Sequence, residues 1–168
     1  MGVFEGSPHG APNHVLINEY KPGQGIMPHE DGLVYYPVVA TVSLGADIVL
    51  DIYPKKNDDE CSKEEEEEEE EEDKPKFRIL QERRSLLVTR KKMYTDFLHG
   101  IAEVDVDHGL DRKGICNWDL LREETREMLS STSGSGSSRQ RETRTSLTYR
   151  DVRNVVKLGN TMKFLGRR

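Results

Sequence analysis

Two polar side chains at an even spacing, His29 and Asp31, could bind a metal ion together. In an extended segment, residues two apart project from the same face, so this imidazole and this carboxylate can approach one ion from one side. A second imidazole would complete the arrangement of two histidines and one carboxylate that holds non-haem iron(II). That arrangement leaves coordination positions open for a cosubstrate and dioxygen.

Two further pairs have even spacings in segments with strand patterns. Asn18 and Tyr20 share one face of the first such segment, and both can form hydrogen bonds. Arg144 and Arg150, six residues apart, share one face of the last segment. The planar guanidinium fork of arginine can bind a carboxylate through two parallel hydrogen bonds. The last strand is therefore a candidate carboxylate site.

Each pair is weak when taken alone. The chain has five histidines, and a single His-x-Asp arises readily by chance. His99 opens a strand-like apolar stretch, where a hydrogen-bonded core histidine explains its presence as well as a metal ligand does. The other histidines are expected at the surface: His9, His14 and His108.

Composition limits the kind of protein that this can be. A chain of 168 residues can form one domain, and 33% charged against 34% hydrophobic residues indicates a modest core. Cys61 and Cys116 are too few for a disulfide framework, which favours a reducing compartment. We expect no membrane association, because no apolar run reaches the roughly 18 residues of a membrane span. The first twelve residues also lack the features of a signal peptide.

The net charge of −6 conceals an uneven distribution. Residues 58–73 contain thirteen acidic residues and one lysine, so the rest of the chain carries +6. The acidic run repels itself and is expected to be a solvated surface insertion. Mimicry of a polyanion and capture of a basic partner are the alternatives for it. The basic remainder is compatible with contacts to phosphate groups.

The segments that must position the polar pairs resemble short β-strands. Alternating patterns, β-branched residues and Pro/Gly turns favour an all-β sandwich or jelly roll. A helical turn is expected within 91–98 and a short helix around 118–129. The expected strands are 15–20, 35–44, 48–53, 77–80, 85–89, 99–106 and 143–156.

Two segments interrupt the strand pattern. One is the acidic insertion, 55–76, and the other, 107–142, includes a Ser/Gly-rich linker. We expect a single domain over 13–156, carrying both segments as long irregular insertions. A basic C-terminal tail, 157–168, follows the domain.

The order of the motifs is more informative than any single motif. NEY (18–20) is followed by PHEDG (28–32), LHGI (98–101) and RTSLTYR (144–150). This series resembles the AlkB family of iron(II)- and 2-oxoglutarate-dependent dioxygenases. The resemblance implies the double-stranded β-helix, or jelly-roll, fold of that family. It also implies His29, Asp31 and His99 as iron ligands, with Fe(II), 2-oxoglutarate and O2 as cofactor and cosubstrates.

The resemblance further implies contacts to 2-oxoglutarate. Arg144, helped by Tyr20, would bind the distal C5 carboxylate. Many members of the family have Asn at the position of Ser146, and some have Ser. Ser146 is therefore also expected to contact 2-oxoglutarate. Arg150 and Asn18 would hold the C1 carboxylate beside the metal. A buried carboxylate without such cationic partners would be costly.

By the same resemblance, the expected activity is oxidative demethylation of alkylated DNA or RNA, with release of succinate, CO2 and formaldehyde. We expect a monomer in the cytoplasm and nucleus. Two alternatives stay open: hydroxylation or demethylation of a protein side chain, and a catalytically silent nucleic-acid-binding module. Members of the family carry a segment with a nucleotide-recognition lid before the NEY motif. That motif begins within twenty residues of Met1 here, so we expect an N-terminally truncated chain.

Overall fold

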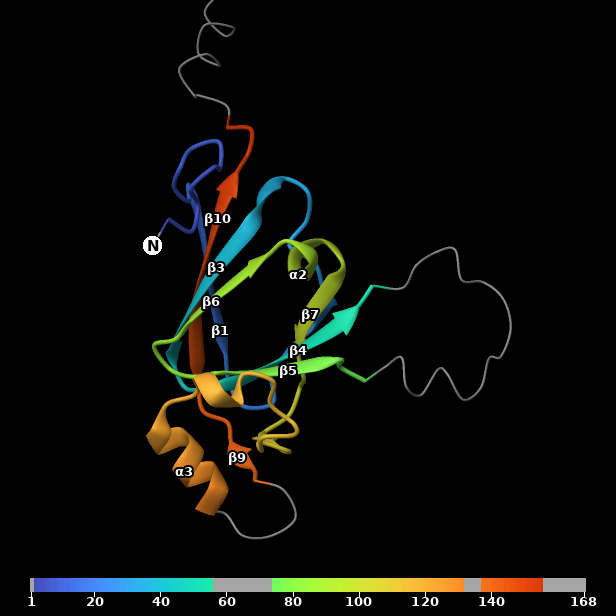
Figure 1. Ribbon diagram of the computed structural model, residues 1–168, viewed down its shortest axis with the longest axis vertical. Helices are drawn as coiled ribbons and strands as arrows, with labels where there is room; N and C mark the ends of the chain where they lie inside the picture. The colour runs from blue at the N-terminus through green and yellow to red at the C-terminus, as the bar shows by residue number, and fades with distance from the viewer. Residues whose placement is uncertain (1, 56–73, 132–136, 156–168) are drawn as a thin grey trace, which may run out of the picture.

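Two antiparallel sheets of four strands form the frame of the protein (Figure 1). The computed structural model describes residues 2–55, 74–131 and 137–155. The first sheet contains, in spatial order, β1 (His14–Tyr20), β10 (Arg144–Val152), β3 (Tyr35–Gly45) and β6 (Leu86–Arg90). The second contains β2 (Ile26–His29), β7 (Phe97–Ile101), β4 (Ile48–Pro54) and β5 (Phe77–Gln81). This architecture confirms the expected jelly-roll fold.

The remaining elements are short. They are α2 (Lys92–Thr95), the 3-10 helix η1 (Trp118–Leu120), α3 (Glu123–Ser131) and a two-stranded pair of β8 (Val106–Asp107) and β9 (Arg139–Gln140). No helix within the described ranges is long and apolar enough to cross a bilayer.

Apolar residues between the two sheets form one part of the core. Ile48, Leu50 and Ile52 alternate along β4 and are buried, and they pack with half-buried Tyr20 and Leu87 from the first sheet. Alternation explains why these β4 side chains face inward together. The β4 residues between them, such as Val49, therefore face the outer side of the second sheet.

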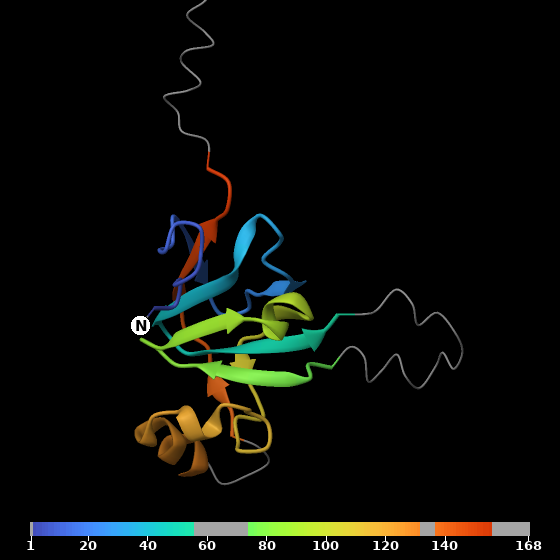
Figure 2. The same ribbon diagram turned by 45° about the horizontal axis from the view of Figure 1, so that its top comes forward.

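The segment after β8 covers that outer side, and the helix expected around 118–129 is present within it as η1 and α3. α3 and η1 lie against the β4–β5 side of the molecule (Figures 1 and 2). Val49 and Leu80 form a buried cluster with side chains from this segment: Leu110, Ile115, Leu121 and Leu129. The described part of the segment thus contributes to the core. Most of the predicted acidic insertion, at 56–73, and all of the basic tail lie outside the described residues.

Three differences from the expected elements have physical causes. β2 is not among the expected strands; it contains Pro28 and lies at the edge of its sheet, where proline is tolerated. The strand expected over 99–106 ends at Ile101, after beginning at Phe97. The last strand ends at Val152, beyond a register irregularity that follows Arg150.

Candidate functional site

A cavity of about 130 Å³ lies between the two sheets. It brings together side chains that come from β1, β2, β7 and β10 and from the turn after β2. All eight site residues expected from the sequence line it: Asn18, Tyr20, His29, Asp31, His99, Arg144, Ser146 and Arg150.

Strand β10 turns its polar face inward. Arg144, Ser146, Thr148 and Arg150 are all buried, whereas Leu147 between them is partly exposed on the opposite face. β10 pairs with β1, so that Tyr20 lies opposite Arg144 and His14 lies opposite Arg150. Buried polar groups are costly unless they find partners, so this inward polar row indicates a ligand site.

The two histidines of the expected metal site are neighbours across strands. His29 and His99 are register partners on β2 and β7, and their ring centroids are 4.4 Å apart. Asp31 follows β2, and its Oδ2 lies 4.0 Å from His99 Nε2. Two imidazoles and one carboxylate thus gather at one part of the cavity wall.

The hydrogen bond of His29 and the burial of His99 both suit metal binding. His29 Nδ1 lies 2.8 Å from the Met27 carbonyl oxygen, which can only accept a hydrogen bond. Nδ1 must therefore carry the proton, which leaves the Nε2 lone pair free for a metal. Burial lowers the pKa of His99 below its usual value of 6.5, although the nearby Asp31 carboxylate acts in the opposite direction. His99 is accordingly neutral at physiological pH.

Arg150 forms an ion pair with Asp31. Its guanidinium also lies over the Tyr35 ring, 4.9 Å from the centroid, and the Asp31 side chain is only 4% exposed. Within the described ranges, no group of three His, Cys, Asp or Glu side chains is arranged closely enough to hold a metal ion as it stands. The donor set nevertheless fits iron(II), because two imidazoles and a carboxylate are the ligands of the facial iron site.

Arg144 is a buried cation with neutral partners. It is 3% exposed, and its Nε and Nη2 donate to Ser43 Oγ over 3.1 and 2.9 Å. Nη2 also donates to Gln81 Oε1, and the guanidinium lies 5.8 Å from the Tyr20 ring centroid. Burial lowers the pKa of Arg144 to about 10, so it is charged at neutral pH. Since no carboxylate among the described residues pairs with it, an anionic ligand would compensate its charge.

Residues 5–150, most of the chain, match the 2OG-Fe(II) oxygenase superfamily. The chain belongs to this superfamily. Members of this superfamily use Fe(II), 2-oxoglutarate and O2, which agrees with the donor set and the buried cation.

Individual relatives confirm that this oxygenase is AlkB-like. It is 37% identical over its full length to the zebrafish (Danio rerio) "Probable RNA/DNA demethylase ALKBH6", and it spans 62% of that protein. It is 29% identical over 143 residues, 84% of the chain, to the Xenopus tropicalis "tRNA (carboxymethyluridine(34)-5-O)-methyltransferase alkbh8", of which it covers 19%. A 46-residue stretch, 27% of the chain, is 41% identical to "Uncharacterized protein L905" of Acanthamoeba polyphaga mimivirus, of which it covers 22%.

Three residues of the oxygenase site were not predicted from the sequence. Ser43 and Gln81 hold Arg144, and Tyr35 lies beneath Arg150. The sequence does contain a feature that indicates Ser43. Thr41 and Ser43 place two hydroxyl groups on one face of an otherwise apolar strand. No comparable sequence feature indicates Gln81, the last residue of β5. Its hydrogen bond to Arg144 depends on how the two sheets pack together.

Proposed function

We propose that the protein is a 2-oxoglutarate-dependent dioxygenase that demethylates alkylated nucleic acid. One observation carries the proposal: the uncompensated cation Arg144 and the His29–Asp31–His99 group line the same cavity. 2-Oxoglutarate carries a carboxylate at each end, so one end can pair with a buried cation while the other approaches a metal.

Arg144 would bind the distal carboxylate of 2-oxoglutarate. Ser43 and Gln81 hold its guanidinium by hydrogen bonds without neutralising its charge. A charged, positioned and desolvated donor pair is a strong carboxylate partner. The ring of Tyr20 covers the guanidinium and restricts its contact with water.

His29, Asp31 and His99 would hold the iron. Bound iron(II) supplies the coupled oxidation of 2-oxoglutarate and of a substrate C–H bond, which no side chain can provide. The residues around the metal would orient its ligands. Arg150 holds Asp31, and the Met27 carbonyl fixes the ring of His29.

Three observations support nucleic acid as the substrate. The zebrafish relative is named a probable RNA/DNA demethylase, and the Xenopus relative is named a tRNA methyltransferase. Outside residues 58–73 the chain carries a net charge of +6, which favours phosphate contacts. In the proposed reaction, one oxygen atom of O2 enters succinate as CO2 leaves. The other enters the N-methyl C–H bond, and the hydroxymethyl group then leaves as formaldehyde, with a proton returned to nitrogen.

The test is an anaerobic titration of the protein with iron(II) and 2-oxoglutarate. We expect a metal-to-ligand charge-transfer absorption band in the wild type and its loss in His29→Ala. Absence of the band in the wild type, or an unchanged band in the variant, would overturn the proposal. Formaldehyde release from methylated oligonucleotides, compared with methylated peptides, then tests the substrate class. Release from the peptides alone would favour a protein substrate.

A further inference from the structure

A second, larger cavity lies at the edge strand β5, away from the catalytic cavity. It has a volume of about 430 Å³ and runs between the start of β5 and the loop that carries η1. We call it the β5 groove. Its lining includes four basic residues, two aromatic residues and one acidic residue: Lys76, Arg78, Arg112, Lys113, Phe77, Trp118 and Asp119.

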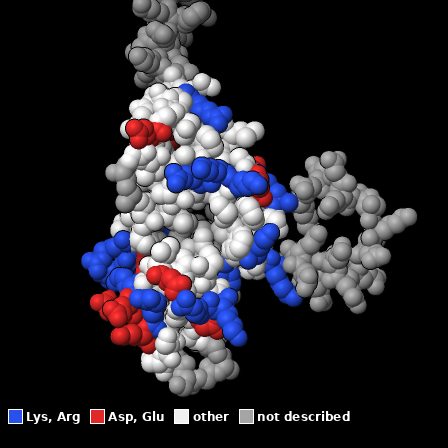
Figure 3. All heavy atoms as spheres, in the orientation of Figure 1, with Lys and Arg blue, Asp and Glu red and all other residues white. Residues whose placement is uncertain are grey.

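The β5 groove is basic. Lys76 and Lys113 are exposed, so both ammonium groups are available to an anion. Arg112 pairs with Asp119 over 2.8 Å, but both side chains are about two-thirds exposed, and such surface pairs are weak. Arg78 forms an ion pair with Asp51 over 3.2 Å, which offsets its charge, so Lys76 and Lys113 carry most of the positive charge of the groove. On the face drawn in Figure 3, Lys and Arg side chains are spread widely, with Asp and Glu side chains among them.

Two aromatic rings lie among these cations. Phe77 is 38% exposed although it belongs to a strand. Trp118 packs on the apolar cluster beneath α3 and also lines the groove. Lys76 Nζ lies 5.9 Å from the centroids of both the Phe77 and the Phe97 ring. Cations beside one exposed and one half-buried ring match a ligand that has both negative charges and flat apolar faces.

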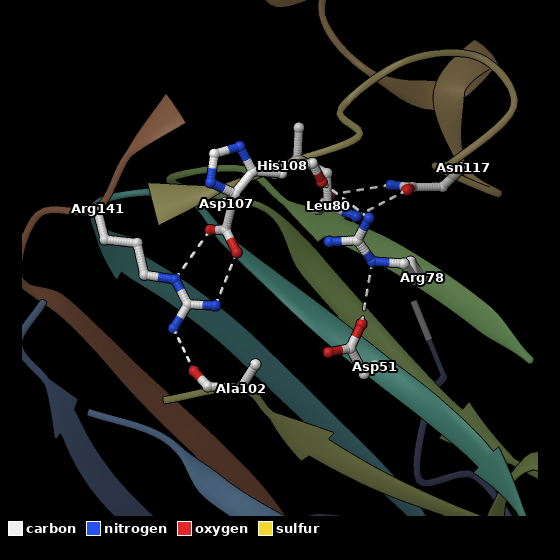
Figure 4. A network of polar contacts seen from close by, with 8 residues as sticks. All are labelled: Asp51, Arg78, Leu80, Ala102, Asp107, His108, Asn117 and Arg141. Carbon is white, nitrogen blue, oxygen red and sulfur yellow. Dashed lines mark hydrogen bonds and ion pairs between the residues drawn. The ribbon is translucent and has the colours of Figure 1, made fainter. Parts of the chain in front are cut away.

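Hydrogen bonds hold the groove in shape. The Cys116 N–H donates to the Arg78 carbonyl over 2.9 Å. The Asn117 side chain accepts from the Leu80 N–H and donates to the Leu80 carbonyl, both over 3.0 Å (Figure 4). The loop that carries Trp118 is therefore fastened to β5, and a ligand would meet a groove that is already formed.

We propose that the β5 groove binds single-stranded nucleic acid, with phosphates on Lys76 and Lys113 and bases on Phe77 and Trp118. This rests on the proposed function in taking nucleic acid as the substrate, and it adds a second contact for the strand. The groove and the catalytic cavity border the same strand, because Gln81 at the other end of β5 lines the cavity. Acidic peptides would satisfy the lysines but would leave the rings without flat partners.

The single tryptophan of the chain, Trp118, reports directly on the groove. The experiment titrates metal-free protein, without 2-oxoglutarate, with an unmodified single strand of about 12 nucleotides. We expect quenching of tryptophan fluorescence. The double variant Lys76→Gln, Lys113→Gln should bind the strand roughly tenfold more weakly. The slope of log K against log salt concentration should become shallower by about 0.7 for each phosphate contact that is lost. Lys21→Gln with Lys92→Gln, which removes two exposed lysines elsewhere, is the matched control.

A second measurement follows a labelled strand by fluorescence anisotropy with Trp118→Leu, which should bind several-fold more weakly. No quenching, or equal binding by the groove and control variants, would overturn the proposal. Equal quenching by poly-L-glutamate would also overturn it, because the groove would then select only for negative charge.

The two proposals fail separately. The His29→Ala variant lacks a proposed metal ligand, but the single strand should still quench its tryptophan fluorescence. Quenching without demethylation would refute only the proposed function, and demethylation without quenching would refute only the groove.

Discussion

His29 and His99 lie directly opposite each other on the antiparallel strands β2 and β7, with ring centroids 4.4 Å apart. They are seventy residues apart in the sequence. Neighbouring strands place opposed Cβ atoms about 5 Å apart, which allows two side chains to share one ion. Asp31, just beyond the end of β2, adds a carboxylate from the same side. Metal affinity should therefore depend on the pairing of these two strands.

Replacing a predicted ligand should abolish metal binding without unfolding the protein. His29→Ala should lower the affinity for iron(II) by more than the roughly 10–100-fold that loss of an outer-shell partner costs. Anaerobic calorimetric titration measures this. Glu30→Gln is the control, because Glu30 is an exposed neighbour that pairs with Lys55. Equal affinities in the two variants would contradict the assignment of His29.

Arg144 should be needed for ligand binding but should not stabilise the ligand-free protein. It is a buried cation with neutral partners, and a buried charge without an opposite charge is costly in free energy. Arg144→Met should therefore keep or raise the Tm of the ligand-free protein. 2-Oxoglutarate should raise the Tm of the wild type but not of the variant. A large loss of stability in the ligand-free variant would instead assign Arg144 a structural role.

Glu82 should link stability to pH. It is buried and accepts hydrogen bonds from Thr125 and from the backbone and side chain of Arg122. Burial raises its pKa, but these hydrogen bonds together outweigh burial and bring the pKa below its usual value of 4.5. A lowered folded-state pKa contributes stability above the unfolded pKa, and that stability is lost as the pH falls through the folded one.

Glu82→Gln should consequently reduce the free energy of unfolding at neutral pH by about 1–3 kcal/mol. Urea denaturation from pH 7 to about pH 3 measures this difference, which should shrink once Glu82 of the wild type is protonated. Glu124→Gln, an exposed change nearby on α3, is the control. A difference that stays constant over this range would contradict the role of the carboxylate.

The buried pair of Arg141 and Asp107 should behave as a unit. Arg141 donates to both Asp107 oxygens, over 2.9 and 2.7 Å, and to the Ala102 carbonyl just beyond β7 (Figure 4). Asp107→Leu or Arg141→Met alone should cost about 3–5 kcal/mol, because each leaves an uncompensated buried charge. The double variant should recover most of the loss. A double-mutant cycle measures this coupling, and additive losses would contradict it.

Spacing within strands was sufficient for half of the site. Asn18 with Tyr20, and Arg144 with Arg150, have side-chain directions that follow from the two-residue period of extended chain. Strand patterns also predicted most of the two sheets. The sequence also predicts the helix around 118–129, which is present as η1 and α3. It does not predict the packing of the rest of 107–142, because apolar residues such as Leu110 and Ile115 form no clear periodic pattern, yet both are buried against the second sheet.

The sequence by itself determined which side chains could serve a metal and a dicarboxylate, and which of them share a strand face, because local geometry follows from residue type and spacing. Only the tertiary structure decided that His99 meets His29, that Arg150 pairs with Asp31, and that Ser43 and Gln81 hold Arg144. These contacts join residues far apart in the chain. They depend on strand register and sheet packing, which long-range burial determines and local pattern does not.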